Sequence, residues 1–408
     1  MHPRDLSIAD FTYSLPPGKI ALHPLAERDA SRLLIYRKGN ITESIYRNIA
    51  GVLPHGAMLV FNDTRVLEAR ILFTKSSGGV IEIFTLEPAG SYPDMAAALQ
   101  QKGTVEWKCL VGGASKWKHD FVPEKTIHTG KVPVTLRAEI RERLTDSFVI
   151  KFSWTPDYLT FPDILHLAGQ VPLPPYIKRI AEEEDRERYQ TVYAREAGSV
   201  AAPTAGLHFT DSIFNELSAK NIQKVFITLH VGAGTFKPVK SEKISGHEMH
   251  SEYLELSAAS ILALSKHNGP LYAVGTTSLR TLESLFWMGV KIGLNKNITP
   301  EELVVSQWEV YDTLCDIQIS RKEALINLLQ WMTENKAEKL ITHTQIMIAP
   351  GYSFRMIQGL ITNFHQPQST LLLLVAAITG PAWKDIYAYA LENGFRFLSY
   401  GDGCLLEV

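Results

Sequence analysis

The stretch Leu271-Tyr-Ala-Val-Gly-Thr-Thr-Ser-Leu-Arg-Thr-Leu-Glu-Ser-Leu-Phe-Trp-Met288 joins a short apolar run to a segment whose apolar residues recur at helical spacing. The run Leu271 to Gly275 predicts a buried strand, because its apolar residues are followed directly by glycine. In the segment Ser278 to Met288, one face of a helix would collect the apolar residues Leu279, Leu282, Leu285 and Phe286. The stretch therefore predicts a strand that leads at once into a helix.

The same order occurs upstream, where Val225 to Val231 predicts a strand and Ser257 to His267 predicts a helix. Strands that alternate with helices are typical of α/β proteins, whose helices cover a mainly parallel sheet. We therefore predict an α/β fold with a mixed or mainly parallel sheet and flanking helices, formed by residues 1–64 and 156–408.

The segment between these two parts is β-rich instead. Ala57 to Phe61 and Arg65 to Phe73 read as two strands on either side of the turn residues Asn62 and Asp63. Further short strands are expected at Val80–Leu86, Val105–Val111, Val132–Leu136 and Ser147–Phe152. Short strands at this spacing favour a barrel or sandwich. We predict that residues 65–155 form an inserted small β-barrel domain.

The bulk composition is that of a soluble globular protein, because 45% of the 408 residues are hydrophobic and 21% are charged. A membrane-spanning helix needs about 20 consecutive apolar residues. The longest apolar run, Leu371 to Ile378, is much shorter and predicts a buried helix. The segment Met1 to Pro17 lacks the pattern of an export signal, and three widely spaced cysteines suit a reducing compartment. We expect a cytoplasmic protein without membrane contact.

The net charge of −2 leaves no overall basic excess for nucleic-acid binding, so an RNA contact requires a local patch. The β-rich region offers basic residues beside an aromatic ring, at Lys102, Lys108, Lys116, Trp117, Lys118 and His119. Such groups can follow a phosphate backbone and stack on a base. A solvated strand rim explains the same residues equally well.

Two strand ends carry residues suited to ligand binding. The strand that ends near His230 runs into a loop with Gly232 and Gly234, followed by Thr235 and Phe236. Glycines let a backbone approach a ligand closely, although the third glycine of a dinucleotide fingerprint is missing and a plain tight turn is an alternative. After the strand at 271–275, hydroxyls stand at a helix start, where they cap N–H groups or help bind an anion: Thr276, Thr277 and Ser278. Arg280 opposes the helix dipole there, which favours a ligand or an acidic partner.

Other candidates stand alone in the sequence. His208 lies in a loop of small residues suited to a pocket floor, and Asn363 and His365 precede the apolar helix as a second pocket wall. Asp402 sits in a Tyr-Gly-Asp-Gly turn and is either a turn residue or functional. His247 and His250 are three residues apart, whereas the zinc signature requires four. We therefore expect no metal site there, and interpret His250 and Glu252 as alternating polar residues on a strand edge, facing a substrate.

Taken together, these segments resemble one family, the S-adenosylmethionine:tRNA ribosyltransferase-isomerases of queuosine synthesis. The resemblance runs nearly end to end and is carried by the strings Arg28–Leu34, Phe61–Val66, Val171–Ile177, Glu187–Tyr193, Gly198–Thr210, Leu229–Phe236, His247–Tyr253, Ala273–Ser284, Thr362–Leu371 and Phe397–Asp402. The region Lys75 to Thr155 matches only loosely. Gln366 and Gly403-Cys404 depart from the family pattern, so a divergent paralogue with another acceptor is an alternative.

The resemblance implies an α/β domain with a β-barrel domain, and we interpret residues 65–155 as a candidate tRNA contact. It also implies transfer and rearrangement of the ribosyl part of S-adenosylmethionine onto the aminomethyl group of a 7-deazaguanine at the wobble position of tRNA with a GUN-type anticodon. Epoxyqueuosine, adenine and methionine would result, and we expect a monomer that needs no metal or redox cofactor. A S-adenosylmethionine-dependent methyltransferase and a non-catalytic RNA-binding module are the competing hypotheses, although the glycine-rich turn of the former and the basic face of the latter are not apparent.

The implied chemistry requires a base that removes a proton beside the sulfonium. We assign this role to His208, His230 or His250, with Asp63 or Glu252 orienting the base or holding the ribose hydroxyls. The expected substrate-binding residues are Arg65, Tyr176, Gly232, Gly234, Thr235, Phe236, Thr276, Thr277, Ser278, Arg280, Asn363, His365 and Asp402.

Overall fold

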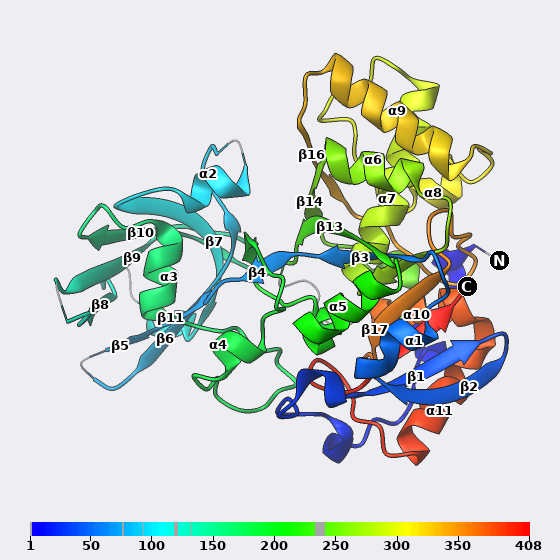
Figure 1. Cartoon of the computed structure of the whole chain (residues 1–408). Helices are drawn as coiled ribbons and strands as arrows, with labels where there is room; N and C mark the ends of the chain where they lie inside the picture. The colour runs from blue at the N-terminus through cyan, green and yellow to red at the C-terminus, as the bar shows by residue number, and fades with distance from the viewer. Residues whose placement is uncertain (1, 76, 93, 118–120, 131, 233–240) are drawn as a thin grey trace.

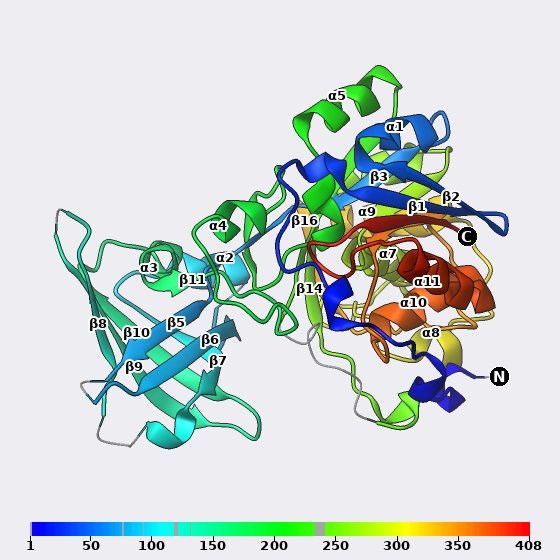
Figure 2. The same ribbon diagram turned by 90° about the horizontal axis from the view of Figure 1, so that it is seen from below.

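The computed structural model describes residues 2–75, 77–92, 94–117, 121–130, 132–232 and 241–408. A larger α/β part and a smaller β-rich part lie side by side (Figure 1, Figure 2). Both ends of the chain lie on the larger part (Figure 1). A short parallel pair, β4 (Thr64–Val66) with β12 (Glu196–Ser199), lies where the two parts meet.

A mixed sheet forms the centre of the larger part. Its strands, in spatial order, are β16 (Lys339–Thr344), β14 (Glu252–Ser257), β13 (Gln223–His230), β3 (Met58–Asn62), β15 (Leu271–Val274), β17 (Gly359–Asn363), β18 (Gly403–Glu407), β1 (Arg32–Arg37) and β2 (Asn40–Ile45). The central run from β13 to β17 is parallel, whereas β14 and β16 on one side and β2 on the other pair antiparallel. The expected α/β fold with a mixed sheet is therefore confirmed.

Helices cover both faces of this sheet because its central strands are apolar on both sides. In β3, Met58 and Val60 face one core, while Leu59 and Phe61 face the other. The first core is closed by α6 (Ala258–Lys266), α7 (Thr276–Leu294), α9 (Arg321–Glu334), α10 (Thr370–Thr379) and α11 (Trp383–Glu392). The second is closed by α1 (Ile49–Val52) and α5 (Asp211–Ala219), and the short α4 (Asp185–Arg188) and α8 (Glu309–Asp312) lie in connections.

The smaller part is a curled antiparallel sheet with its own apolar core. Its strands, in spatial order, are β11 (Gly169–Gln170), β5 (Arg70–Thr74), β6 (Val80–Pro88), β7 (Thr104–Gly112), β10 (Phe148–Thr155), β9 (Val134–Arg143) and β8 (Glu124–Ile127). Helices α2 (Met95–Leu99) and α3 (Phe161–Ala168) pack against it. The edge strands β8 and β11 do not pair in the ranges that the structure describes. The smaller part is therefore a curled, open sheet, whereas a closed barrel was expected. The boundaries at residues 64/65 and 155/156 stay a prediction.

One expected strand is wrong in its extent. Arg65 to Phe73 does not continue through one strand, because the chain leaves β4 at Val66 and re-enters a different sheet at Arg70. The intervening Leu67 donates its N–H to the carbonyl of Ser199. Partners distant in sequence, and not the local apolar run, therefore decide where each strand ends.

The apolar run at Leu371 lies in a helix, as expected. The segment Thr370–Glu392 is long and apolar enough to cross a membrane by length and composition, with a mean hydropathy of 1.3 in its best window. That window is 56% buried inside the protein, and Gly380-Pro381 divides the segment into α10 and α11. Core helices of soluble proteins pass the same length and composition criterion, so this segment is weak evidence for a membrane span.

Candidate active site

The candidate site lies where parallel strands of the large sheet end. The strands β3, β15 and β17 run in the same direction and end at Asn62, Val274 and Asn363, respectively. Ligands of α/β proteins commonly bind at the carboxyl ends of such strands. The residues that follow β13, β15 and β17 line one cavity here, so the topology brings together segments that are far apart in the sequence.

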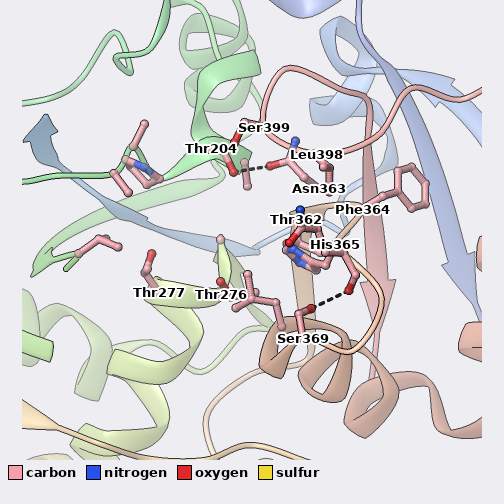
Figure 3. Close-up of a pocket in the computed structure, with 18 of the residues that line it drawn as sticks. Thr204, Thr276, Thr277, Thr362, Asn363, Phe364, His365, Ser369, Leu398 and Ser399 are labelled. Carbon is pink, nitrogen blue, oxygen red and sulfur yellow. Dashed lines mark hydrogen bonds between the residues drawn. The ribbon is translucent and has the colours of Figure 1, made fainter. Parts of the chain in front are cut away.

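This first cavity is walled by aromatic, hydroxyl and amide groups. Figure 3 shows Thr276 and Thr277 at the start of α7 on one side, and Thr204 and Ser399 across the cavity. The lining residues include Tyr176, Tyr189, Pro203, Thr204, Val231, Gly275, Thr276, Thr277, Thr362, Asn363, Phe364, His365, Ser369, Leu371, Leu398 and Ser399.

A second cavity adjoins the first and shares the wall formed by Thr276, Thr277 and Leu371. Its remaining lining residues are His247, Met249, His250, Glu252, Arg280, Ile346, Met347, Ile348, Thr370 and Leu374. Polar side chains of both cavities therefore surround this shared wall.

The start of α7 forms that shared wall. Gly275 precedes the helix with φ of +90° and offers no side chain to cap it. Ser278 does not cap it either, because its hydroxyl is fully buried and donates to the carbonyl of Val274 at 2.8 Å. The positive end of a helix dipole therefore faces the cavities without a side-chain cap, which favours an anionic ligand group.

An ion pair lines the second cavity. The guanidinium of Arg280 donates through Nη1 to Glu252 on β14, and through Nε to the carbonyl of Ile346 at 3.2 Å. Both Arg280 and Glu252 are buried, with exposed fractions of 7% and 6%. The sequence predicts either a ligand or an acidic partner for Arg280, and the structure shows the acidic partner, Glu252.

A hydrogen-bond chain fixes the amide of Asn363 in the first cavity. Thr204 donates to Oδ1 of Asn363 at 2.8 Å, as Figure 3 shows, and Nδ2 of Asn363 lies 3.2 Å from Nε2 of His208. His208 is 4% exposed and stacks on Tyr46 with the ring centroids 4.3 Å apart. Burial lowers the pKa of His208 to about 3, so the imidazole is neutral at pH 7.

Two more predicted residues, His365 and Tyr176, line the first cavity and are held by side-chain hydrogen bonds. His365 lies 2.9 Å from the hydroxyl of Thr362 through Nε2, and burial lowers the pKa of His365 to about 3. The hydroxyl of Tyr176 lies 2.6 Å from that of Ser399. His365 is therefore a neutral, hydrogen-bonded wall residue, and Tyr176 presents a ring to the cavity.

Of the three histidines considered as the base, His250 alone lines either cavity, and it is exposed. His208 lies behind Asn363 and lines a separate small cavity beside Tyr400. His230 turns its Nδ1 toward Gly198, where an added Cβ would come within 2.6 Å, and burial lowers the pKa of His230. The Nδ1 atom of His230 has no hydrogen-bond partner among the described residues.

The remaining predicted residues lie apart from the two cavities. Asp63 lines an open groove beside Thr228, which donates to it at 2.8 Å, and burial raises the pKa of Asp63. Asp402 is 2% exposed and accepts from the backbone N–H groups of Arg32 and Arg396, so it fixes a turn. Arg65 is exposed on β4.

The glycine loop is described only at its start. Gly232 follows β13, and a Cβ built on it would meet nothing within 4 Å. Gly234, Thr235 and Phe236 lie outside the described residues, as do Lys118 and His119 of the basic patch. Within the described ranges, no group of three or more His, Cys, Asp or Glu side chains is placed to hold a metal ion.

Sequence reasoning missed several wall residues. Thr204 and Ser399 lie inside strings that carry the family resemblance, but nothing in the spacing of small residues marks one hydroxyl as facing a cavity. Met249 and Met347 belong to a loop before β14 and a loop after β16, which meet only because the two strands pair. These contacts depend on tertiary structure and have no local signal.

The fold is that of an α/β protein with two adjoining polar cavities at its strand ends. Residues 8–406 match the family described as queuosine biosynthesis protein, so the chain belongs to this family, as its motifs indicated. It is 37% identical over 405 residues to the S-adenosylmethionine:tRNA ribosyltransferase-isomerase of Citrifermentans bemidjiense, covering 98% of this chain and 99% of the relative.

A second relative and one solved structure are also similar to this chain. The S-adenosylmethionine:tRNA ribosyltransferase-isomerase of Legionella pneumophila (strain Corby) is 37% identical over 403 residues, which cover 97% of this chain and 98% of the relative. A solved structure, the S-adenosylmethionine tRNA ribosyltransferase of Thermotoga maritima, is similar with 25% identity and a TM-score of 0.45, over 97% of this chain and 99% of that chain.

Proposed function

We propose that this protein transfers and isomerises the ribosyl moiety of S-adenosylmethionine onto the aminomethyl group of a 7-deazaguanine at the tRNA wobble position. The products are epoxyqueuosine in tRNA, adenine and methionine. The observation that carries this proposal is the end-to-end match to relatives named S-adenosylmethionine:tRNA ribosyltransferase-isomerase. The joined cavities at the strand ends supply a place for a donor with a nucleoside end and an amino-acid end.

The reaction needs a base near the sulfonium, and we assign this role to His250. The positive sulfur acidifies the neighbouring C–H groups, so a neutral imidazole in reach is a competent acceptor. His250 lines the second cavity next to the shared wall. Buried, low-pKa imidazoles such as His208 are instead suited to accept a hydrogen bond and hold a neighbouring group.

The partners follow from the reaction. The acceptor is a tRNA with a GUN-type anticodon. The curled sheet of the smaller part is a candidate surface for tRNA contact. We further propose that the enzyme acts as a monomer in the cytoplasm. We propose that no metal or redox cofactor takes part, since the sulfonium itself activates the donor. Arg65 is exposed on β4 between the two parts, a position suited to a tRNA phosphate.

Product mass tests the proposal directly. The protein is incubated with S-adenosylmethionine and a tRNA that carries the aminomethyl-deazaguanine, the tRNA is digested, and the modified nucleoside is weighed. A gain that corresponds to the ribosyl-derived unit, with equimolar adenine release, supports the proposal. A methyl gain would instead identify a methyltransferase, and no change with this tRNA would point to a paralogue with another acceptor.

A further inference from the structure

We propose that the second cavity binds the α-amino-acid end of the donor, with Arg280 and the first turn of α7 at its carboxylate and Glu252 at its ammonium group. This inference rests on the proposed function and assigns a part of the donor to each cavity. The nucleoside end then occupies the first cavity, and the sulfonium lies at the shared wall of Thr276, Thr277 and Leu371.

Arg280 retains one N–H pair for which the described residues offer no acceptor. Its Nη1 and Nε donate to Glu252 and to the carbonyl of Ile346, whereas Nη2 is buried and has no acceptor in the described part of the chain. A buried charged donor without an acceptor costs free energy, so native proteins usually satisfy such groups. A ligand carboxylate in the second cavity would supply the missing acceptor.

The start of α7 adds a second source of positive potential at the same wall. The helix runs for 19 residues from Thr276, and in the described part of the chain no side chain caps its first turn. Thr276 and Thr277 line the cavity that Arg280 also lines. A carboxylate held between this helix end and Nη2 of Arg280 would therefore meet two fixed positive groups.

The signs of charge favour an amino acid over a phosphate. Glu252 is 6% exposed and lines the cavity together with Arg280, so a purely anionic group would be repelled by its carboxylate. Its Oε2 accepts from Arg280. A zwitterion brings an ammonium group for Glu252 and a carboxylate for Arg280, so each member of the ion pair gains a second opposite charge.

The rest of the cavity suits the chain between the amino acid and the sulfur. Its apolar wall is formed by Met249, Ile346, Met347, Ile348, Leu371 and Leu374. Methionine side chains are polarizable and adapt to irregular aliphatic groups. The two methylenes of the donor would lie against this wall, with the sulfur directed toward the first cavity.

The test compares two donors on the unmodified full-length protein without tRNA. Calorimetry measures the binding of S-adenosylmethionine and of its decarboxylated analogue, which differs by the carboxylate alone. We expect the complete donor to bind about 10- to 100-fold more tightly, as is typical of a charge-assisted hydrogen-bonded pair. In Arg280→Gln this preference should fall to within about 3-fold, whereas Thr204→Val in the first cavity should leave it in place.

Equal affinities of the two donors for the unmodified protein would overturn the inference, and this comparison does not depend on whether a variant folds. A preference that persists in folded Arg280→Gln, with weaker and less salt-dependent tRNA binding, would also overturn it and assign Arg280 to a phosphate. If the ribosyl-derived product forms but the carboxylate preference is absent, only this inference fails. If neither donor binds and no product forms, the proposed function fails as well.

Discussion

Asn363 donates a hydrogen bond through Nδ2 to Nε2 of the buried His208, at 3.2 Å. An amide nitrogen can only donate, so Nε2 must carry no proton, and this agrees with the low pKa of His208. Thr204 donates to the other end of the same amide. His208 is therefore a positioning residue, because it fixes which way the Asn363 amide faces in the first cavity.

Replacing His208 separates positioning from base catalysis. His208→Gln retains an acceptor for Asn363, so we expect kcat/KM for adenine release to fall less than about 10-fold, whereas His208→Ala should lose about 10- to 100-fold through the freed amide. The pH profile of kcat should keep its acid limb in the Gln variant. A loss of 1,000-fold or more in both variants, with the acid limb gone, would make His208 the base after all.

Acid should destabilise the protein through its buried neutral histidines. The pKa of His208 and that of His365 are each about 3 in the folded state, against 6.5 for a free imidazole, so the unfolded chain binds more protons between these values. Stability that is complete above about pH 6.5 is then lost as the pH falls toward 3. From pH 7 to 5 each histidine should contribute a loss of about 2 kcal/mol.

Urea unfolding at pH 7, 6 and 5 measures this dependence. The double variant His208→Gln, His365→Gln should show a shallower decline than the unmodified protein, whatever its stability at pH 7. The exposed His55 supplies the control variant His55→Gln, which is measured in the same series. Identical slopes for the double variant and the unmodified protein would show that neither buried imidazole resists protonation.

His250 is the histidine whose loss should affect chemistry most. We expect His250→Ala to slow adenine release by about 100- to 10,000-fold, the usual range for a positioned base, while donor binding changes little. His230→Ala serves as the matched control, because His230 packs against Gly198 and lines neither cavity. Adenine release is followed by chromatography with tRNA present. Full activity of the Ala variants of His208, His230 and His250 would remove all three from the candidates for the base.

The sequence predicts those parts of the fold whose signals are local. The strand and helix around Gly275 are found because an apolar run, a glycine and a helical face follow one another within 18 residues. β8 (Glu124–Ile127) is missed because four residues with two charges show no apolar pattern. The end of β4 at Val66 depends on Ser199, which is too distant in sequence to be recognised.

The site shows the same division. The sequence points to Thr276 and Thr277 because they stand between a predicted strand and a predicted helix, and both line the first cavity. The acidic partner of Arg280 is expected as a type of residue, yet its identity as Glu252 follows from the pairing of β13 with β14. The role of His208 as an acceptor requires knowing that β17 brings Asn363 beside it, which no spacing in the sequence indicates.

The packing of α7 on α9 predicts a reversal of the usual effect of glycine in a helix. Alanine normally stabilises a helix interior by about 0.5–1 kcal/mol relative to glycine. At Gly289, however, a Cβ would lie 2.1 Å from the carbonyl oxygen of Ala324 on α9, so Gly289→Ala must push the helices apart and should destabilise the protein by about 1–3 kcal/mol. At Gly293, one turn on, a Cβ would meet the amide end of the Asn327 side chain, which donates to the carbonyl of Gly289 at 3.1 Å and can shift more easily than backbone. Gly293→Ala should therefore be neutral or stabilising by up to about 1 kcal/mol. Thermal unfolding of both variants compares the two sites, and a Gly289→Ala protein as stable as Gly293→Ala would show that the helices are not packed this closely.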